Sequence, residues 1–398
     1  IRAFGRAEYR YFAELNFLEN KDAVTAVNGA RDADDLFARL SLLFTETLVP
    51  GQTLIFLDEI QESIDVITMI KFLVERHEYD FVLSGSLLGV ELKNVRSVPV
   101  GYLDVVEMYP LDFEEFCWSQ LTGMDVLAPV REAFETRAPL DDFVHKQFLS
   151  LFRRYLVLGG MAEAVATFND THDLAQVRRI LDYITVLYRE DISKYNPARA
   201  LTIKEVYDLL PSELNQQNKR FILKNLNEGP AFRRYENDFV WLAEAGVALP
   251  TYKVREPKRP LLLSKLRNLF KLFMSDVGLL TSRFLRDSSL AVLDSGLDLN
   301  CGAIYENAVA QELLAHGHDL YYYHSKKFGE LDFVLENAAG DITAIEVKSG
   351  KDYKRHRALS NLLDVQDYTF ADAIVLCNGN VEREGRISYL PIYMASML

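Results

Sequence analysis

Cysteine is scarce in this sequence: Cys117, Cys301 and Cys377 are the only three among 398 residues. Because they are odd in number and far apart, they predict neither a disulfide framework nor a cysteine-rich zinc site. Long apolar runs are also missing, since none approaches the roughly 20 residues that span a bilayer. The first residues, IRAFGRAEYR, lack the apolar core of a signal peptide. These absences lead us to expect a cytoplasmic protein with no membrane partner.

Basic residues are outnumbered by acidic ones, 44 to 58, and the formal net charge is −14. This balance argues against indiscriminate coating of nucleic acid. The stretch 253–271, KVREPKRPLLLSKLRNLFK, nevertheless carries seven basic residues against the single acid Glu256. It has the size of a phosphate-binding footprint, with Lys258 and Arg259 as candidate contacts to DNA or RNA. Equally, its two prolines can mark an exposed turn whose basic residues pair with acids of the same chain.

Length and patterning predict an α/β protein of several domains, because 398 residues exceed one core of ordinary size. Residues 1–120 alternate short apolar strands, such as TLIFLDEI and DFVLSGS, with helical stretches. This βαβα pattern predicts a parallel sheet covered by helices. Residues 121–195 show helical periodicity that is broken at Gly159 and Gly160, which predicts a small helical lid.

The second half of the chain divides into two further regions. Residues 196–285 contain short helical patterns followed by the strand-like stretches VALPTYKV and RPLLLS, an order that predicts a winged-helix domain. Arg233 and Arg234 begin its last helix, where such a domain contacts nucleic acid. The same helix carries acids and apolar core positions, so a purely structural role is the alternative. Residues 286–398 begin with the helix AIYENAVAQELLAHG and continue with several strands, which predicts a separate α/β domain.

Two adjacent carboxylates, Asp58 and Glu59, follow the apolar run 54–57. Four consecutive apolar residues predict a strand that is buried on both faces, as in a parallel sheet. Such sheets bind ligands beyond the carboxyl ends of their strands. There one acid can hold a hydrated magnesium ion while the next orients an attacking water. Alternatively, Asp58 caps the following helix and Glu59 adds charge to its first turn; for an isolated pair this second interpretation is favoured.

Several motifs occur together in a fixed order. They are LDEIQ, LSGS, VPVGYLDVVEMYPLDFEEF, GGMAEAV, LYREDISKY, FVWLAEAGVALP, KLFMSDVGLL, ENAVAQEL and IEVKSG. With them the chain resembles, over essentially its whole length, a prokaryotic family of AAA-type P-loop ATPases whose C-terminal domain of unknown function contains a nuclease-like fold. The resemblance implies that Asp58 holds magnesium through water and that Glu59 polarises the water attacking the γ-phosphate of ATP. It also implies that Ser84 or Ser86, with Ser86 slightly preferred, contacts that phosphate, although both serines suit simple turn chemistry.

The glycine-rich GxxxxGK[ST] loop of that family does not occur in these 398 residues. In the family this loop binds the phosphates through its backbone amides and lysine. Either a segment carrying the loop precedes Ile1, or this version has lost nucleotide binding. Because the later ATPase elements are present, we expect the first. Gly101 and Tyr102 stand where relatives often carry Gly-Arg, so an arginine contact to phosphate from that position is in doubt.

Near the C-terminus, Glu306, Asp332, Glu346 and Lys348 resemble in order and spacing the residues of the PD-(D/E)XK nuclease fold. On a strand, Glu346 and Lys348 point the same way because side chains repeat every two residues. A neighbouring strand presenting Asp332 would complete two carboxylates and an amine around one Mg²⁺ or Mn²⁺ ion. Alternatively, these residues are charges that pair across a surface hairpin. Even with a nuclease-like fold, cleavage and a binding-only role stand about equal.

Two classes of function follow from the sequence. In the first, ATP turnover controls a metal-dependent nuclease domain that acts on DNA or RNA. In the second, the protein is an ATP-driven switch or scaffold, and its nuclease-like fold recognises a protein partner or a second copy of the chain. The acidic balance favours the second class, and the set of Asp332, Glu346 and Lys348 favours the first.

Overall fold

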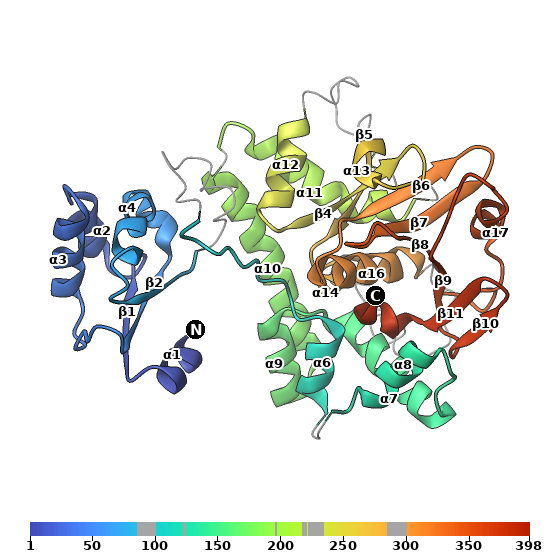
Figure 1. Cartoon of the computed structure of the whole chain (residues 1–398), viewed down its shortest axis with the longest axis horizontal. Coiled ribbons are helices and arrows are strands. Elements are labelled where there is room, and N and C mark those ends of the chain that lie inside the picture. Colours follow the sequence, from blue (N-terminus) through green and yellow to red (C-terminus); the bar gives the residue numbers. More distant parts are fainter. Residues whose placement is uncertain (86–100, 122–124, 196, 217–220, 222–234, 285–300) are drawn as a thin grey trace. The chain divides into compact units, whose positions relative to one another are not determined.

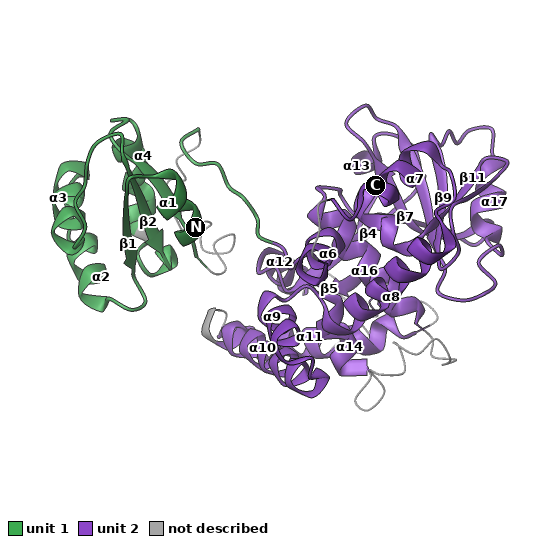
Figure 2. Ribbon diagram, turned by 90° about the horizontal axis from the view of Figure 1, so that it is seen from below, with its two compact units in different colours: residues 1–108 green, residues 109–398 purple. Residues whose placement is uncertain are grey.

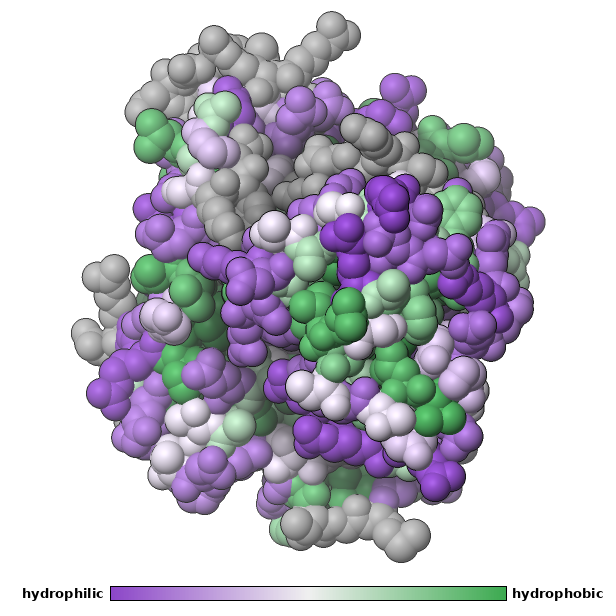
Figure 3. Space-filling model, turned by 90° about the vertical axis from the view of Figure 1, so that its left-hand side faces the viewer, coloured by the Kyte–Doolittle hydropathy of each residue, from purple (hydrophilic) through white to green (hydrophobic). Residues whose placement is uncertain are grey.

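The computed structural model describes residues 1–85, 101–121, 125–195, 197–216, 221, 235–284 and 301–398. They form two compact units, residues 1–108 and residues 109–398 (Figure 2). Each unit is described by itself. On the face shown in Figure 3, hydrophobic patches lie between hydrophilic side chains. Among the residues that the structure describes, no helix is long and apolar enough to cross a membrane.

A parallel three-stranded sheet in the order β1-β2-β3 forms the centre of unit 1 (Figure 1). Its strands are β1 (Tyr11–Asn16), β2 (Thr53–Asp58) and β3 (Asp80–Leu83). The helices of this unit are α1 (Arg2–Glu8), α2 (Lys21–Asn28), α3 (Ala33–Leu43), the short 3-10 helix η1 (Ile60–Glu62) and α4 (Ile64–Val74). The expected parallel sheet and its fully buried central strand are confirmed, because β2 is buried from Thr53 to Leu57.

Helices cover both faces of this sheet, which explains the continuous apolar run in β2. Ala13, Leu15, Ile55 and Leu57 point to one face, where they pack with apolar side chains of α2, α3 and α4. On the other face α1 lies so close that a Cβ atom on Gly5 would be 2.3 Å from the ring of Phe12. A strand that is buried from both sides cannot keep the alternation of a half-exposed strand.

An eight-stranded mixed sheet forms the centre of unit 2, in the order β10-β11-β9-β8-β7-β6-β4-β5. Its strands are β4 (Ala248–Val254), β5 (Lys265–Met274), β6 (Tyr321–Ser325), β7 (Gly329–Glu336), β8 (Ile342–Val347), β9 (Asp372–Cys377), β10 (Glu382–Glu384) and β11 (Ile387–Pro391). The helices are α6 (Phe113–Gln120), α7 (Ala128–Thr136), α8 (Asp142–Leu158), α9 (Ala162–Thr171), α10 (Leu174–Tyr195), α11 (Ala200–Leu214), α12 (Glu236–Glu244), α13 (Leu261–Ser264), α14 (Val277–Phe284), α16 (Gly302–Ala315), α17 (Arg357–Leu363) and the 3-10 helix η5 (Ile392–Met397).

The regions expected to form a winged helix and a nuclease-like domain share this sheet. The antiparallel hairpin of β4 and β5 pairs with the later strands through β6, with Tyr252 opposite Tyr321. Strands from both regions therefore belong to one sheet. The expected strand RPLLLS is also wrong, since residues 261–264 form the short helix α13 and the strand starts at Lys265. The Leu261 amide donates to Glu336 Oε2 at 2.7 Å, which fixes this turn of helix against β7.

The helices from α7 to α10 confirm the helical periodicity and its break, because α8 ends at Leu158 and α9 begins at Ala162. At both positions of the break, a side chain larger than that of glycine would clash with neighbouring atoms. A Cβ on Gly159 would lie 2.2 Å from Asp276 Oδ1, and one on Gly160 would lie 2.0 Å from the Leu111 carbonyl oxygen. The Gly160 amide donates to Asp276 Oδ2 at 2.6 Å. These contacts join the motifs GGMAEAV and KLFMSDVGLL in space.

The start of unit 2 also packs against its end, far along the chain. Arg137 forms an ion pair with Asp372 at 2.9 Å. The Leu140 amide donates to Asn380 Oδ1 at 3.0 Å, across 240 residues of sequence. His145 Nδ1 lies 2.9 Å from the hydroxyl of Tyr393 in η5. The helices expected to form a lid are thus tied to the C-terminal strands of the same compact unit.

One buried carboxylate, Glu312 on α16, gives unit 2 a predictable pH dependence. It accepts the Phe113 amide at 3.0 Å, and burial followed by the nearby charge of Asp112 raises the pKa of Glu312 from 4.5 to about 8. Since the folded-state pKa is raised, the stability that the protonated acid contributes is complete below pH 4.5 and is lost as the pH rises through about 8. In the wild type the free energy of unfolding should fall between pH 4.5 and about 8, by about 1.4 kcal/mol for each unit by which the pKa of Glu312 is raised. Glu312→Gln removes the titrating group and should make this fall smaller. Urea unfolding at pH 5 and pH 8 measures it, and an unchanged pH slope would contradict the assignment.

Candidate functional site

The carboxyl ends of the three strands of unit 1 bring together Asn16, Asp58 and Ser84. Asn16 lies opposite Asp58 in the parallel register of β1 and β2, and its Nδ2 donates to Asp58 Oδ2 at 2.8 Å. The Ser84 hydroxyl, just after β3, donates to Asp58 Oδ1. Asp58 is partly buried and is held from both neighbouring strands. The Asp58 carboxylate is therefore fixed at the sheet edge where parallel α/β sheets bind ligands.

Glu59 stands in an unusual backbone conformation directly after Asp58. Its φ of 55° and ψ of 45° lie in the left-handed region, which non-glycine residues rarely adopt. Its amide donates to Asp58 Oδ1 at 3.1 Å, and Gln61 Nε2 donates to its Oε2 at 2.5 Å. Such strained residues cluster at active sites and switch regions. Glu59 is the N-cap residue of η1, and its side chain accepts no capping hydrogen bond there.

The residue types at this edge fit a magnesium nucleotide. Carboxylate, amide and hydroxyl oxygens are the hard ligands that magnesium prefers, and the ion is commonly held through water in such sites. Asp58, Asn16 and Ser84 supply these groups within one hydrogen-bonded cluster. Ser86, the preferred phosphate contact from the sequence, lies outside the described residues, as do Arg233 and Arg234. Their assigned contacts stay predictions.

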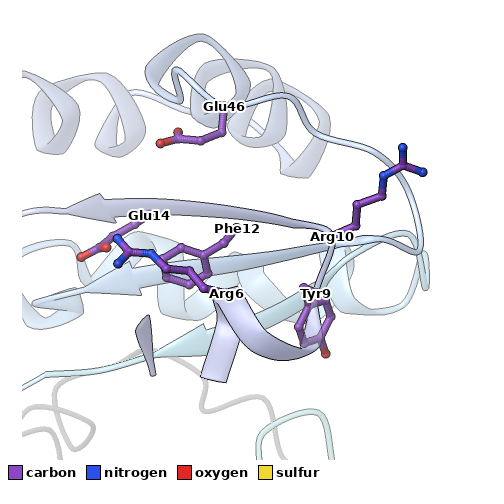
Figure 4. Close-up of a pocket in the computed structure, with 6 residues that line it drawn as sticks. All are labelled: Arg6, Tyr9, Arg10, Phe12, Glu14 and Glu46. Carbon is purple, nitrogen blue, oxygen red and sulfur yellow. The ribbon is translucent and has the colours of Figure 1, made fainter. Parts of the chain in front are cut away.

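A cavity of about 310 Å³ lies elsewhere in unit 1 (Figure 4). Its lining residues come from α1, β1 and the loop before β2, and are Arg6, Tyr9, Arg10, Phe12, Glu14 and Glu46. None of them belongs to the cluster around Asp58. The lining holds two arginines and two glutamates, so the cavity carries no excess of positive charge for a triphosphate.

In unit 2 the structure brings Glu306, Asp332, Glu346 and Lys348 to one place, as the sequence predicted, but around a residue that sequence reasoning assigned elsewhere. Lys271 on β5 is fully buried there. Its Nζ lies 2.8 Å from Glu330 Oε1, 3.4 Å from Glu306 Oε2 and 3.8 Å from Asp332 Oδ1. The amine thus faces three carboxylates from β7 and α16. Together, six residues form the carboxylate centre: Lys271, Glu306, Glu330, Asp332, Glu346 and Lys348.

The strand β8 completes the carboxylate centre. Lys348 Nζ lies 2.5 Å from Glu346 Oε1. Asp332 Oδ2 accepts the Val347 amide at 2.8 Å, which links β7 to β8. Glu346 is buried, and its Oε2 has no hydrogen-bond partner in the described part of the chain. A surface hairpin does not describe Glu346, which is buried, whereas Asp332 and Lys348 are partly exposed and contact opposite charges of the same chain.

Lys271 and Glu330 are the members of this centre that the sequence analysis missed. Lys271 is the last of the seven basic residues of the stretch 253–271. It pairs with acids of the same chain, as the second interpretation of that stretch expects, but it is fully buried and does not lie in an exposed turn. The available signal was its position inside the apolar run LFKLFM, where a lone lysine must find buried acids. Lys258 pairs with Glu256 at 3.7 Å and Asp367 at 3.5 Å. For Lys258 the alternative of pairing within the chain is thus the one observed.

Only part of the predicted metal site therefore fits a metal ion. Glu346 offers a buried oxygen, but Asp332 already contacts an amide and an ammonium group. Within the described ranges, no group of three or more His, Cys, Asp or Glu side chains is arranged to hold a metal ion. We assign no chemical step to a metal in unit 2.

Family comparisons divide the chain into three segments. Residues 7–117 match the model of an AAA domain. Residues 149–289 and 301–394 match two domains of unknown function, DUF8612 and DUF4143. No curated protein and no solved structure matches the chain. The first match supports an AAA-type P-loop ATPase domain with an α/β fold, for which ATP and usually magnesium are the implied ligands.

Proposed function

We propose that the protein binds and hydrolyses ATP at the strand ends of unit 1. The observation that carries this proposal is the Asp58 carboxylate, held by Asn16 and Ser84, with Glu59 on a left-handed turn beside it. A bound magnesium ion would supply charge neutralisation for the phosphates. Asp58 would hold that ion through water, and Ser84 and Asn16 would keep the carboxylate oriented. Glu59 would accept a hydrogen bond from the attacking water and polarise it.

The roles of the two acids are supported by how differently they are held. Both oxygens of Asp58 accept hydrogen bonds from the protein, so its position is fixed before any ligand arrives. Among the described residues, Glu59 accepts one side-chain hydrogen bond, from Gln61. A fixed acid suits an ion-holding role, and a less constrained acid next to it suits contact with a mobile water. Both residues lie at the carboxyl edge of a parallel sheet, which is where ligands bind in this class of fold.

The test compares Asp58→Asn with Asp65→Asn in the protein as its gene encodes it. Asp58→Asn should lower magnesium-dependent ATP hydrolysis by at least about tenfold, because a neutral amide is a weaker partner for the hydrated ion. Asp65 is an exposed acid in the first turn of α4 and serves as the matched control. Phosphate release at saturating ATP measures the effect. Equal rates in the two variants would contradict the assignment of Asp58.

For unit 2 we propose that it binds a protein partner and that this binding depends on the nucleotide state of unit 1. The buried Lys271 supports this second class of function, because it supplies a positive charge inside the carboxylate centre. A metal-dependent nuclease is the other candidate. Its support is the juxtaposition of Glu306, Asp332, Glu346 and Lys348, together with the buried oxygen of Glu346. The experiment in the next section separates the two.

A further inference from the structure

The position of Lys271 follows from the alternation of β5. Along LFKLFM the side chains of a strand alternate between two faces, and residues from Phe270 to Met274 are buried on both. Lys271 therefore cannot reach solvent and instead lies on the Tyr322 ring, with its Nζ 5.2 Å from the ring centroid. A buried charge of this kind is stable only when paired with opposite charge. The three carboxylates at 2.8, 3.4 and 3.8 Å supply that pairing.

The Lys271 ammonium group has as many N–H donors as there are carboxylates around it. An ammonium group has three N–H donors and no acceptor, and the Nζ of Lys271 faces one oxygen each of Glu306, Glu330 and Asp332. Burial by itself lowers the pKa of Lys271, but the attraction of these three acids outweighs burial and raises the pKa above its usual value. The lysine thus carries its charge throughout the pH range in which proteins function.

The Lys271 ammonium group lies among the carboxylates. Its shortest contact, 2.8 Å to Glu330 Oε1, has the length of a charge-assisted hydrogen bond. An ion bound beside Lys271 would meet the repulsion of a positive charge held in a poorly solvated place. Asp332 has already committed its second oxygen to the Val347 amide. Glu346 Oε2 is the remaining buried acceptor at the centre, and it is the point at which a metal would have to compete.

We propose that the Lys271 ammonium group is the resident cation of the carboxylate centre and takes the place of a divalent metal ion there. Unit 2 is then held together by an internal ion cluster and does not cleave nucleic acid by metal-dependent hydrolysis. This inference concerns unit 2 and is independent of ATP hydrolysis in unit 1. It also identifies a single residue whose removal opens a cation site.

The test measures Mn²⁺ binding without nucleotide, from the signal of free Mn²⁺ in electron paramagnetic resonance. The proteins are wild type, Lys271→Met, the double variant Lys271→Met/Asp332→Asn, and Lys265→Met as a control on the same strand. Lys271→Met should bind Mn²⁺ at least about tenfold more tightly than wild type, because the repelling charge is gone. The double variant should lose this gain, and Lys265→Met should not show it. Ions held in unit 1 are common to all four proteins and cancel in the comparison.

A second arm needs no change at Lys271 and decides the question if Lys271→Met does not fold. It compares wild type with Asp332→Asn for Mn²⁺ binding and for Mn²⁺-dependent nicking of supercoiled DNA and degradation of single-stranded RNA. Equal binding and no cleavage by either protein support the proposal. Wild-type binding or cleavage that disappears in Asp332→Asn would overturn it, as would a folded Lys271→Met that gains no ion. Both arms measure ion binding and cleavage without nucleotide, so failure here is distinguishable from failure of the proposed function.

Discussion

Glu59→Gln should leave ATP bound while its hydrolysis slows by about a hundredfold or more, the size of effect that a lost acid–base group produces. Glutamine keeps the length and shape of the side chain but cannot draw a proton from the attacking water. The contact from Gln61 and the left-handed turn both depend little on the charge of residue 59. Nucleotide affinity is therefore expected to persist. Single-turnover hydrolysis and equilibrium binding of ATP, measured on the same preparation, separate the two quantities.

The matched control for this prediction is Glu46→Gln. Glu46 is an exposed acid of unit 1 that lines the cavity of Figure 4, away from the strand ends. Its replacement should leave hydrolysis near the wild-type rate. A reversed result, with slow hydrolysis in Glu46→Gln and normal hydrolysis in Glu59→Gln, would move the nucleotide site to the cavity.

Lys271→Met should destabilise unit 2 by about 3 to 5 kcal/mol in metal-free buffer at neutral pH, the usual cost of breaking a buried ion pair from one side. Methionine fills similar volume, so the loss comes chiefly from carboxylates left without their counter-ion. Lowering the pH should reduce the deficit, because those carboxylates can then take up protons. Lys265→Met, on the partly exposed start of β5, is the control and should cost much less.

Tryptophan fluorescence gives a selective measurement of this effect. The chain has two tryptophans, Trp118 and Trp241, and both lie in unit 2. Urea unfolding followed by their emission therefore reports on unit 2 separately from unit 1. A deficit below about 1 kcal/mol, the range of an exposed ion pair, would show that Lys271 is not an essential counter-ion.

Local sequence patterns predicted the elements that depend on near neighbours. The apolar run before Asp58 predicted a strand covered on both faces, and the two glycines after Leu158 predicted the end of a helix. The period of a strand placed Glu346 and Lys348 together. In each case the information lies within a few residues, because it concerns the direction of side chains or the end of a helix.

The errors concern partners that are distant in sequence. β4 pairs with β6, with Tyr252 opposite Tyr321. The sequence of neither strand indicates which other strand it pairs with. Lys271 ends the basic stretch 253–271, whereas its acids lie on α16 and β7. The apolar run LFKLFM signals that Lys271 is buried, but it does not identify the acids that pair with it. A single sequence therefore does not predict which charged residues of distant elements pair with each other.

The packing of the first helices of unit 2 against its last residues has a consequence for synthesis on the ribosome. Leu140 meets Asn380, a partner that emerges 240 residues later. At a synthesis rate of about 5 to 20 residues per second, the helices α6 to α8 wait roughly 10 to 50 s for that partner. Their large aromatic side chains, among them Phe116 and Phe152, are fully buried in the finished protein and have no complete core during this interval. The core of unit 2 can therefore be completed only after the residues around Asn380 have been synthesised.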